Sequence, residues 1–258
     1  MVIKMIRNKI CAYCRKPMSV KTINEENTQS YEHLIPNVAT NRKRKKDEAD
    51  FYVCRACNTQ KSKVDNILGK CAKIQGKNDE IALRTIKKER SKNSPLFKSL
   101  KSSASISLNG PIASMPIKGP ELIEYISFLG KGQFLRQTGK IYDPQKNVME
   151  ILWANKQIMS QLEKDYETQH HSNPFRDLKK NPNTELINDG ECVINSDKFK
   201  YLFFIHDYFF VSITILPNTR RNREKAKLSE RNLLRWFLGK KPKKLPPKKL
   251  KSNKKKKR

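Results

Sequence analysis

The spacing of apolar residues along the chain predicts both helices and strands. Between residues 64 and 88 the apolar positions recur at intervals of three and four, as on the buried face of a helix: Val64, Ile67, Leu68, Cys71 and Ala72. Residues 121–129 and 147–166 also predict helices. Residues 201–215 are rich in Phe, Tyr, Ile and Val and therefore predict strands. The pattern indicates an α+β fold.

Changes in composition divide the chain into four parts. Residues 1–90 contain two cysteine pairs and the predicted helix, and residues 91–119 accumulate Ser, Lys, Pro and Gly, as in a linker or irregular loop. Residues 120–238 hold enough apolar material for a second, mixed α/β domain. In residues 239–258, Lys and Arg supply 12 of the 20 positions and acids none, which predicts a disordered basic tail.

The chain has 258 residues, enough for about two domains, and a formal net charge of +30. Such an excess favours a polyanionic partner, with nucleic acid first among candidates. No run of about 18 apolar residues exists, so we expect no membrane span. The first ten residues lack the features of a secretory signal, and we expect a cytoplasmic protein.

Four of the six cysteines form two Cys-x-x-Cys pairs, Cys11 with Cys14 and Cys54 with Cys57. Each pair on a tight turn can aim two thiolates at one point, and two pairs complete a tetrahedral zinc site with no position open to substrate. We therefore predict a structural Zn²⁺ that stabilises the first domain. Cys71 and Cys192 have no Cys or His neighbours at ligand spacing, and core packing explains them more simply.

Between the two pairs, residues 31–36 read Tyr-Glu-His-Leu-Ile-Pro, and Asn58 directly follows the second pair. The order Cys-x-x-Cys, acid-His-aliphatic-Ile-Pro and Cys-x-x-Cys-Asn-x-x-Lys, over about residues 8–70, resembles the zinc-containing branch of the HNH, or ββα-metal, endonucleases. The resemblance implies a small zinc-stabilised ββα-metal nuclease domain. It implies Glu32 as the first ligand of a catalytic ion, His33 as the general base and Asn58 as a further ligand.

The chemistry of phosphodiester hydrolysis suits these residue types. The reaction needs a water nucleophile, a base for its proton and positive charge near the developing negative oxygens. A neutral imidazole is suited to be the base near pH 7, and the oxygens of Glu32 and Asn58 suit Mg²⁺ or Mn²⁺. Adjacent strand positions point to opposite faces, so a site that contains both Glu32 and His33 requires a strand end or a loop.

One position departs from the family pattern. Where the family carries its middle Asn, four or five residues before the second cysteine pair, this chain has Ala49 and Asp50. Asp50 can accept backbone hydrogen bonds and fix the loop of His33, but it lacks an amide donor. This departure keeps open an alternative, a catalytically inactive zinc-stabilised nucleic-acid-binding protein. The lysine tail suggests a third, a ribosome- or RNA-associated structural protein, although neither alternative needs Glu32 and His33.

Basic residues surround the predicted site. Their position would let them contact the phosphate backbone near the scissile bond. A run of charged residues that is simply exposed to solvent is an equally good explanation. The candidate nucleic-acid contacts are Arg42, Lys43, Arg44, Lys45, Lys46, Lys61 and Lys63. Elsewhere, Gly130-Lys-Gly132 predicts a turn rather than a phosphate loop. His206 and Asp207, between two aromatic runs, predict a buried strand or hairpin position rather than a metal site.

Together these features predict a hydrolase, a metal-dependent HNH-type endonuclease that acts on nucleic acid, with DNA favoured over RNA.

Overall fold

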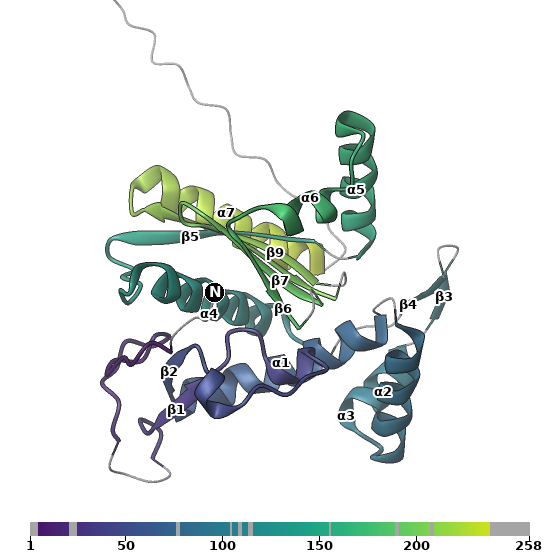
Figure 1. Ribbon diagram of the computed structural model, residues 1–258, viewed down its shortest axis with the longest axis horizontal. Coiled ribbons are helices and arrows are strands. Elements are labelled where there is room, and N and C mark those ends of the chain that lie inside the picture. Colours follow the sequence, from purple (N-terminus) through teal and green to yellow (C-terminus); the bar gives the residue numbers. More distant parts are fainter. Residues whose placement is uncertain are drawn as a thin grey trace, which may run out of the picture.

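The computed structural model describes residues 5–20, 25–75, 78–103, 105–107, 110–112, 116–154, 156–188, 191–206 and 209–237 (Figure 1). The lysine-rich tail predicted over residues 239–258 lies outside them. The described chain is α+β, as predicted from the sequence.

The N-terminal part contains two short antiparallel strands followed by a long helix: β1 (Gln29–Glu32), β2 (Phe51–Cys54) and α1 (Arg55–Gln75). The segment that connects the strands includes two single-turn helices, η1 (Asn37–Ala39) and η2 (Lys46–Glu48). Phe51 and Val53 alternate along β2 and are both fully buried, which fixes the register of the pair. In this register Glu32, the last residue of β1, lies opposite Phe51.

Beyond α1, the chain forms two more helices and a small hairpin: α2 (Asp79–Ser91), α3 (Pro95–Ser103), β3 (Ser105–Ser107) and β4 (Gly110–Ile112). The prediction of an irregular linker over residues 91–119 is therefore wrong for much of its length. Ser94 accepts a hydrogen bond from Phe97 N at 3.1 Å and caps α3, while Pro95 occupies its first position. Ser followed by Pro is a signal for the start of a helix. The linker was predicted from the Ser and Pro content of the segment, which does not take the order of these residues into account.

The C-terminal part is a five-stranded antiparallel sheet in the order β5-β9-β8-β7-β6. Its strands are β5 (Asn147–Ala154), β6 (Thr184–Ile187), β7 (Cys192–Asp197), β8 (Lys200–Ile205) and β9 (Phe209–Pro217), with α5 (Lys156–His170) and α6 (Pro174–Lys180) between β5 and β6. The strands predicted over residues 201–215 are confirmed. The helix predicted over 147–166 is wrong in its first half, because residues 147–154 pair with β9 as strand β5.

The last described helix, α7 (Arg220–Phe237), lies along the outer edge of β5. Ile151 N of β5 donates a hydrogen bond to Ser229 Oγ of α7 at 3.2 Å. The helix thereby satisfies an edge-strand donor that no other strand pairs with. Among the described residues, no helix is both long enough and apolar enough to cross a membrane.

Helix α4 (Gly119–Thr138) lies between the N-terminal elements and the sheet, and it is apolar on nearly all sides (Figure 1). Gly130 and Gly132 lie on opposite faces of the helix, because residues two positions apart in an α-helix are rotated by about 200° about its axis. A Cβ at Gly130 would lie 3.0 Å from Ile213 Cγ2 of the sheet, and one at Gly132 would lie 2.6 Å from Leu34 Cδ1. The predicted turn at these glycines is thus wrong. They allow α4 to approach both neighbours closely, and one buried core extends through both parts of the chain.

Candidate active site and metal cluster

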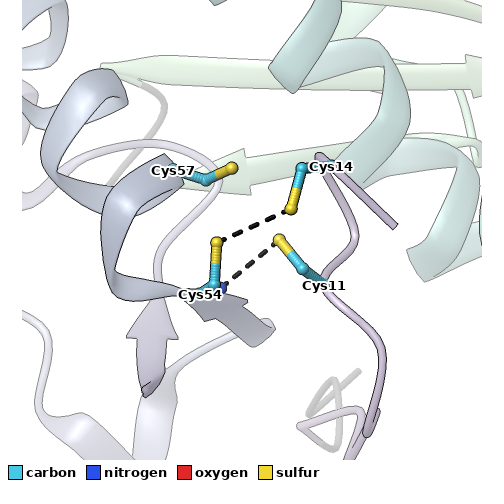
Figure 2. Close-up of side chains that lie close together, drawn as sticks. All are labelled: Cys11, Cys14, Cys54 and Cys57. Atoms are coloured by element: carbon cyan, nitrogen blue, oxygen red, sulfur yellow. Dashed lines mark hydrogen bonds between the residues drawn. The ribbon is translucent and has the colours of Figure 1, made fainter. Parts of the chain in front are cut away.

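Four cysteine side chains from two distant stretches of the sequence meet at one point (Figure 2). Cys11 and Cys14 lie on a turn near the N-terminus, Cys54 ends β2, and Cys57 lies in the first turn of α1. Their sulfur atoms all lie within 4.8 Å of one another, and none of the four forms a disulfide. The predicted convergence of the cysteines is confirmed, and the cluster could bind a metal ion such as zinc.

The backbone of the first pair is held in a tight knuckle. Cys11 O accepts a hydrogen bond from Arg15 N at 3.0 Å, and Cys11 N donates one to Lys16 O at 2.9 Å. Arg15 has a φ of 67°, in the left-handed region that non-glycine residues rarely adopt. Such a conformation persists where the surroundings determine it, and here it turns both thiols toward the second pair.

The pKa values of Cys11, Cys54 and Cys57 show why a cation fits between the thiols. A hydrogen bond with Cys57 lowers the pKa of Cys11 to about 4, whereas burial raises the pKa of Cys54 to about 11. Hydrogen bonding with Cys11 and burial raise the pKa of Cys57 further still. One thiolate forms readily and opposes the next. A bound cation would remove that opposition by attracting all four thiolates.

A second site lies at the end of β1, where an open pocket of about 270 Å³ separates the strand end from α1. Its polar lining includes Glu32, His33, Asn37, Asn58, Ser62, Asp65 and Asn66. The structure therefore brings Glu32, His33 and Asn58 to the same pocket. His33 follows the last residue of the strand, which satisfies the requirement for a strand end.

His33 is half-buried in the wall of this pocket, and its Nδ1 atom is buried with no hydrogen-bond partner among the described residues. Burial lowers the pKa of His33 below its ordinary value, and the nearby Arg44 lowers it further. The imidazole is consequently neutral near pH 7.

The amide of Asn58 is oriented by its neighbours. Its Nδ2 donates a hydrogen bond to Ser30 Oγ at 2.6 Å, and its Oδ1 accepts one from Ser62 Oγ at 3.4 Å. The carbonyl oxygen thus has capacity for one more partner in the pocket. Asn58 lies within α1, which begins at Arg55, and therefore does not cap the helix.

Glu32 differs from the expectation of a free metal ligand. Its side chain is only 2% exposed, and its Oε1 lies 2.8 Å from Lys61 Nζ. Lys61 is fully buried, and its Nζ also lies 2.8 Å from Asp65 Oδ2. Burial raises the pKa of Glu32 to about 7, an effect that Lys61 opposes and Asp65 reinforces. The prediction that Lys61 contacts phosphate is wrong, because its ammonium has no access to solvent.

Asp50 fixes the chain that carries His33. Its Oδ2 accepts a hydrogen bond from Leu34 N at 2.7 Å, and its own N donates one to Glu32 O at 2.8 Å. This is the backbone contact considered for Asp50 from the sequence. Arg136 of α4 forms an ion pair with it, with Nε 3.2 Å from Asp50 Oδ1. Helix α4 thus takes part in holding the loop.

The basic run over residues 42–46 divides into two kinds of side chain. Arg42, Lys43, Lys45 and Lys46 are exposed, although Arg42 pairs with Glu48 at 2.8 Å. Arg44 is largely buried, donates to Ile35 O and lies 3.6 Å from Asp50 Oδ2. Arg44 therefore ties the loop together, and only 16% of its side chain is exposed for a contact with phosphate. Lys63 on α1 is exposed and remains a candidate contact.

Comparisons with protein-family models, curated proteins and solved structures found no match to this chain. The function must therefore be inferred from the geometry and chemistry of the site.

Sequence analysis missed Asp65, Arg136 and the two tyrosines beside the buried acids, Tyr13 and Tyr125. Burial, together with the nearby acids Glu32 and Asp65, raises the pKa of both tyrosines. A signal for Lys61 and Asp65 did exist in the sequence. Both fall on the face of α1 that Val64 and Leu68 define, at intervals of three and four.

Proposed function

We propose that this protein is a zinc-stabilised ββα-metal (HNH-type) endonuclease that hydrolyses phosphodiester bonds in nucleic acid, with DNA as the favoured substrate. The observation that carries the proposal is the shared pocket, in which His33, the acid before it and Asn58 meet. The end of β1, the segment that follows it and α1 surround that pocket, and the four cysteines tie β2 and α1 to the N-terminal knuckle. A closed sulfur cluster beside an open oxygen-lined pocket supports a structural metal and a catalytic one.

In this proposal His33 is the general base. The lowered pKa keeps its ring neutral, and a neutral imidazole in the pocket wall can take the proton of the attacking water. Asn58 and Glu32 would hold Mg²⁺ or Mn²⁺, which when bound offsets the charge that develops on the phosphate oxygens. Asp50 keeps the loop of His33 in place through Leu34 N.

Binding of the nucleic acid would come from exposed cations. Lys43, Lys45 and Lys46 follow His33 in the same connecting segment, and Lys63 lies on α1. Contacts of this kind to phosphate raise affinity for any sequence and weaken as salt is added. With a net charge of +30 the whole chain favours such binding.

The test is a cleavage assay on plasmid DNA, single-stranded DNA and RNA, with Mg²⁺, Mn²⁺ or a chelator. We expect His33→Ala to cleave at least about 100-fold more slowly, with unchanged zinc content, fold and nucleic-acid affinity. His170→Ala is the matched control, because His170 is exposed on α5. Cleavage by His33→Ala at the parental rate would remove His33 from the mechanism, and loss of zinc or fold would make it a structural residue.

A second candidate function is nucleic-acid binding without cleavage. It is favoured by the ion pair between Lys61 and Glu32, which occupies one oxygen of the proposed ligand, and by Asp50 in place of an amide. The same assay separates the candidates. Tight, salt-sensitive binding with no cleavage of any of the three substrates in Mg²⁺ or Mn²⁺ would support the binding protein.

A further inference from the structure

Lys61 is the most completely buried charged side chain near the candidate active site, and it makes contacts on several sides. Its Nζ lies 2.8 Å from Glu32 Oε1, 2.8 and 3.1 Å from the two oxygens of Asp65, and 3.3 Å from His33 O. The ring of Tyr125 on α4 lies 5.6 Å from the same nitrogen. An ammonium has three donors, and here they reach both residues of the Glu32–His33 pair and one anchoring acid.

We propose that Lys61 is the positioning residue of this pocket, which sets the carboxylate of Glu32 and the backbone of His33 relative to each other. The proposal rests on the proposed function, because it assigns to Lys61 a role in that same site. Asp65, one helical turn further along α1, holds the ammonium from the other side.

Stability alone does not account for a lysine in this place. An ammonium with no exposed surface loses its hydration, and a buried ion pair commonly contributes no more stability than apolar side chains of the same volume would. Two acids and one lysine also leave the cluster with a formal charge of −1. What such a cluster does provide is a fixed geometry, since each oxygen must stay near the ammonium to remain compensated.

The contact with His33 O gives Lys61 an influence on the base as well as on the ligand. Asp50 holds the next residue through Leu34 N, so the backbone around His33 is fixed by one contact on each side. The His33 ring is therefore directed into the pocket from a restrained backbone. Groups that orient a metal ligand from behind commonly change metal affinity or activity by about 10- to 100-fold when they are lost.

The experiment compares Lys61→Met with Lys87→Met in the full-length protein. Both changes remove one ammonium from a helix, but Lys87 is exposed on α2 and lies outside the pocket. For Lys61→Met we expect the maximal cleavage rate to fall about 10- to 100-fold and the Mn²⁺ concentration for half-maximal rate to rise about 10-fold. Mn²⁺ binding without nucleic acid, followed by electron paramagnetic resonance, should weaken to the same extent. Zinc content should stay the same, and Lys87→Met should leave both Mn²⁺ readouts unchanged.

A merely structural role would give a different result. Lys61→Met would then lose rate only in proportion to its unfolded fraction, with an unchanged Mn²⁺ half-saturation, and the proposal would be overturned while the nuclease function stood. If Lys61→Met does not fold, the proposal is tested with Asp65→Asn, in which the Mn²⁺ half-saturation of the cleavage rate and the binding of Mn²⁺ without nucleic acid are measured. Asp65→Asn removes the anchor of Lys61 but keeps its contact with Glu32, so we expect a smaller rise in half-saturation, and an unchanged value overturns the proposal.

Failure of the proposed function can be distinguished from failure of this inference. If the parent protein cleaves none of the substrates, the nuclease proposal fails, and the ring signals of His33 in nuclear magnetic resonance spectra decide the role of Lys61. Those signals should shift in Lys61→Met and stay in place in Lys87→Met. Signals that stay in place in both variants would overturn the positioning role.

Discussion

The four-cysteine cluster and the pocket of His33 both use residues of α1, yet they differ in the ligands that they offer and in how open they are. The cysteine cluster has four soft ligands that point at one another and leave no room for a substrate. The pocket has hard oxygen and nitrogen groups around an open volume of about 270 Å³. The first arrangement suits a structural ion, and the second suits a reaction.

The two sites also differ in how they depend on the rest of the molecule. The cysteines come from the N-terminal knuckle, β2 and α1, and complete their cluster without a side chain from elsewhere. The pocket depends on α4, whose Arg136 pairs with Asp50 and whose Tyr125 lies beside Lys61. The four ligands of the cluster are thus local, although α4 also contacts the knuckle, where Lys131 Nζ donates a hydrogen bond to Tyr13 O at 3.1 Å. In the pocket, side chains of α4 hold the residues proposed for chemistry.

The largest expected effect concerns the cysteine cluster. We expect about one zinc per chain by elemental analysis, and we expect Cys54→Ser with Cys57→Ser to lose it. The N-terminal part should then unfold, because the binding of structural zinc contributes on the order of 10 kcal/mol to small folds. Circular dichroism would measure the loss. Cys71→Ala on the same helix should keep its zinc, and zinc retained by the double variant would break the comparison.

A smaller effect is expected at the open pocket. Glu32→Gln should reduce cleavage by about 10- to 100-fold, and raising Mg²⁺ or Mn²⁺ should restore part of it, because mass action refills a weakened ion site. Extra metal should not rescue His33→Ala, since a missing proton acceptor cannot be replaced by an ion. Glu48→Gln, a change in the same connecting segment, is the control. Equal rescue of both pocket variants would contradict the division of roles.

The pH dependence of stability gives a third test. The pKa of Glu32 is raised to about 7 from its ordinary 4.5, so its protonated form favours the folded state. This contribution is full below about pH 4.5 and is lost as pH rises through 7. In Glu32→Gln the loss should disappear. We expect the variant to gain about 2.5 kcal/mol relative to the parent between pH 5 and pH 8, measured by urea unfolding. A constant difference would show that Glu32 titrates alike in both states.

The smallest effect on turnover is expected for the tail. Deleting residues 239–258 removes 12 Lys and Arg residues and should weaken binding and flatten its dependence on salt. Cleavage at saturating substrate should remain, because the four-cysteine cluster and the pocket of His33 both lie outside the deleted segment. Filter binding from 50 to 300 mM salt would measure the change. An unaltered salt dependence would exclude the tail from the interface.

The cysteine cluster could be predicted from the sequence almost completely, because a Cys-x-x-Cys pair carries its own turn and its own ligands. The strands over residues 201–215 were predicted for a similar reason, since apolar β-branched and aromatic runs indicate a buried strand wherever they occur. The strand over 147–154 was missed, because its pairing with β9 outweighs a local pattern that also fits a helix. Local signals decide an element only where no distant partner overrides them.

The sequence by itself determined the four ligands of the cluster, the neighbouring pair of Glu32 and His33, and the strong positive charge. Only the tertiary structure decided that Lys61 and Arg44 point inward while Lys43 and Lys63 remain exposed. The partners of Lys61 and Arg44 include groups far along the chain, such as Glu32 and Asp50, and contacts of this kind form only when β1, the connecting segment and α1 pack together. Whether a cation binds phosphate or holds an acid depends on that packing, because burial removes its hydration and leaves only the nearest acid to compensate it.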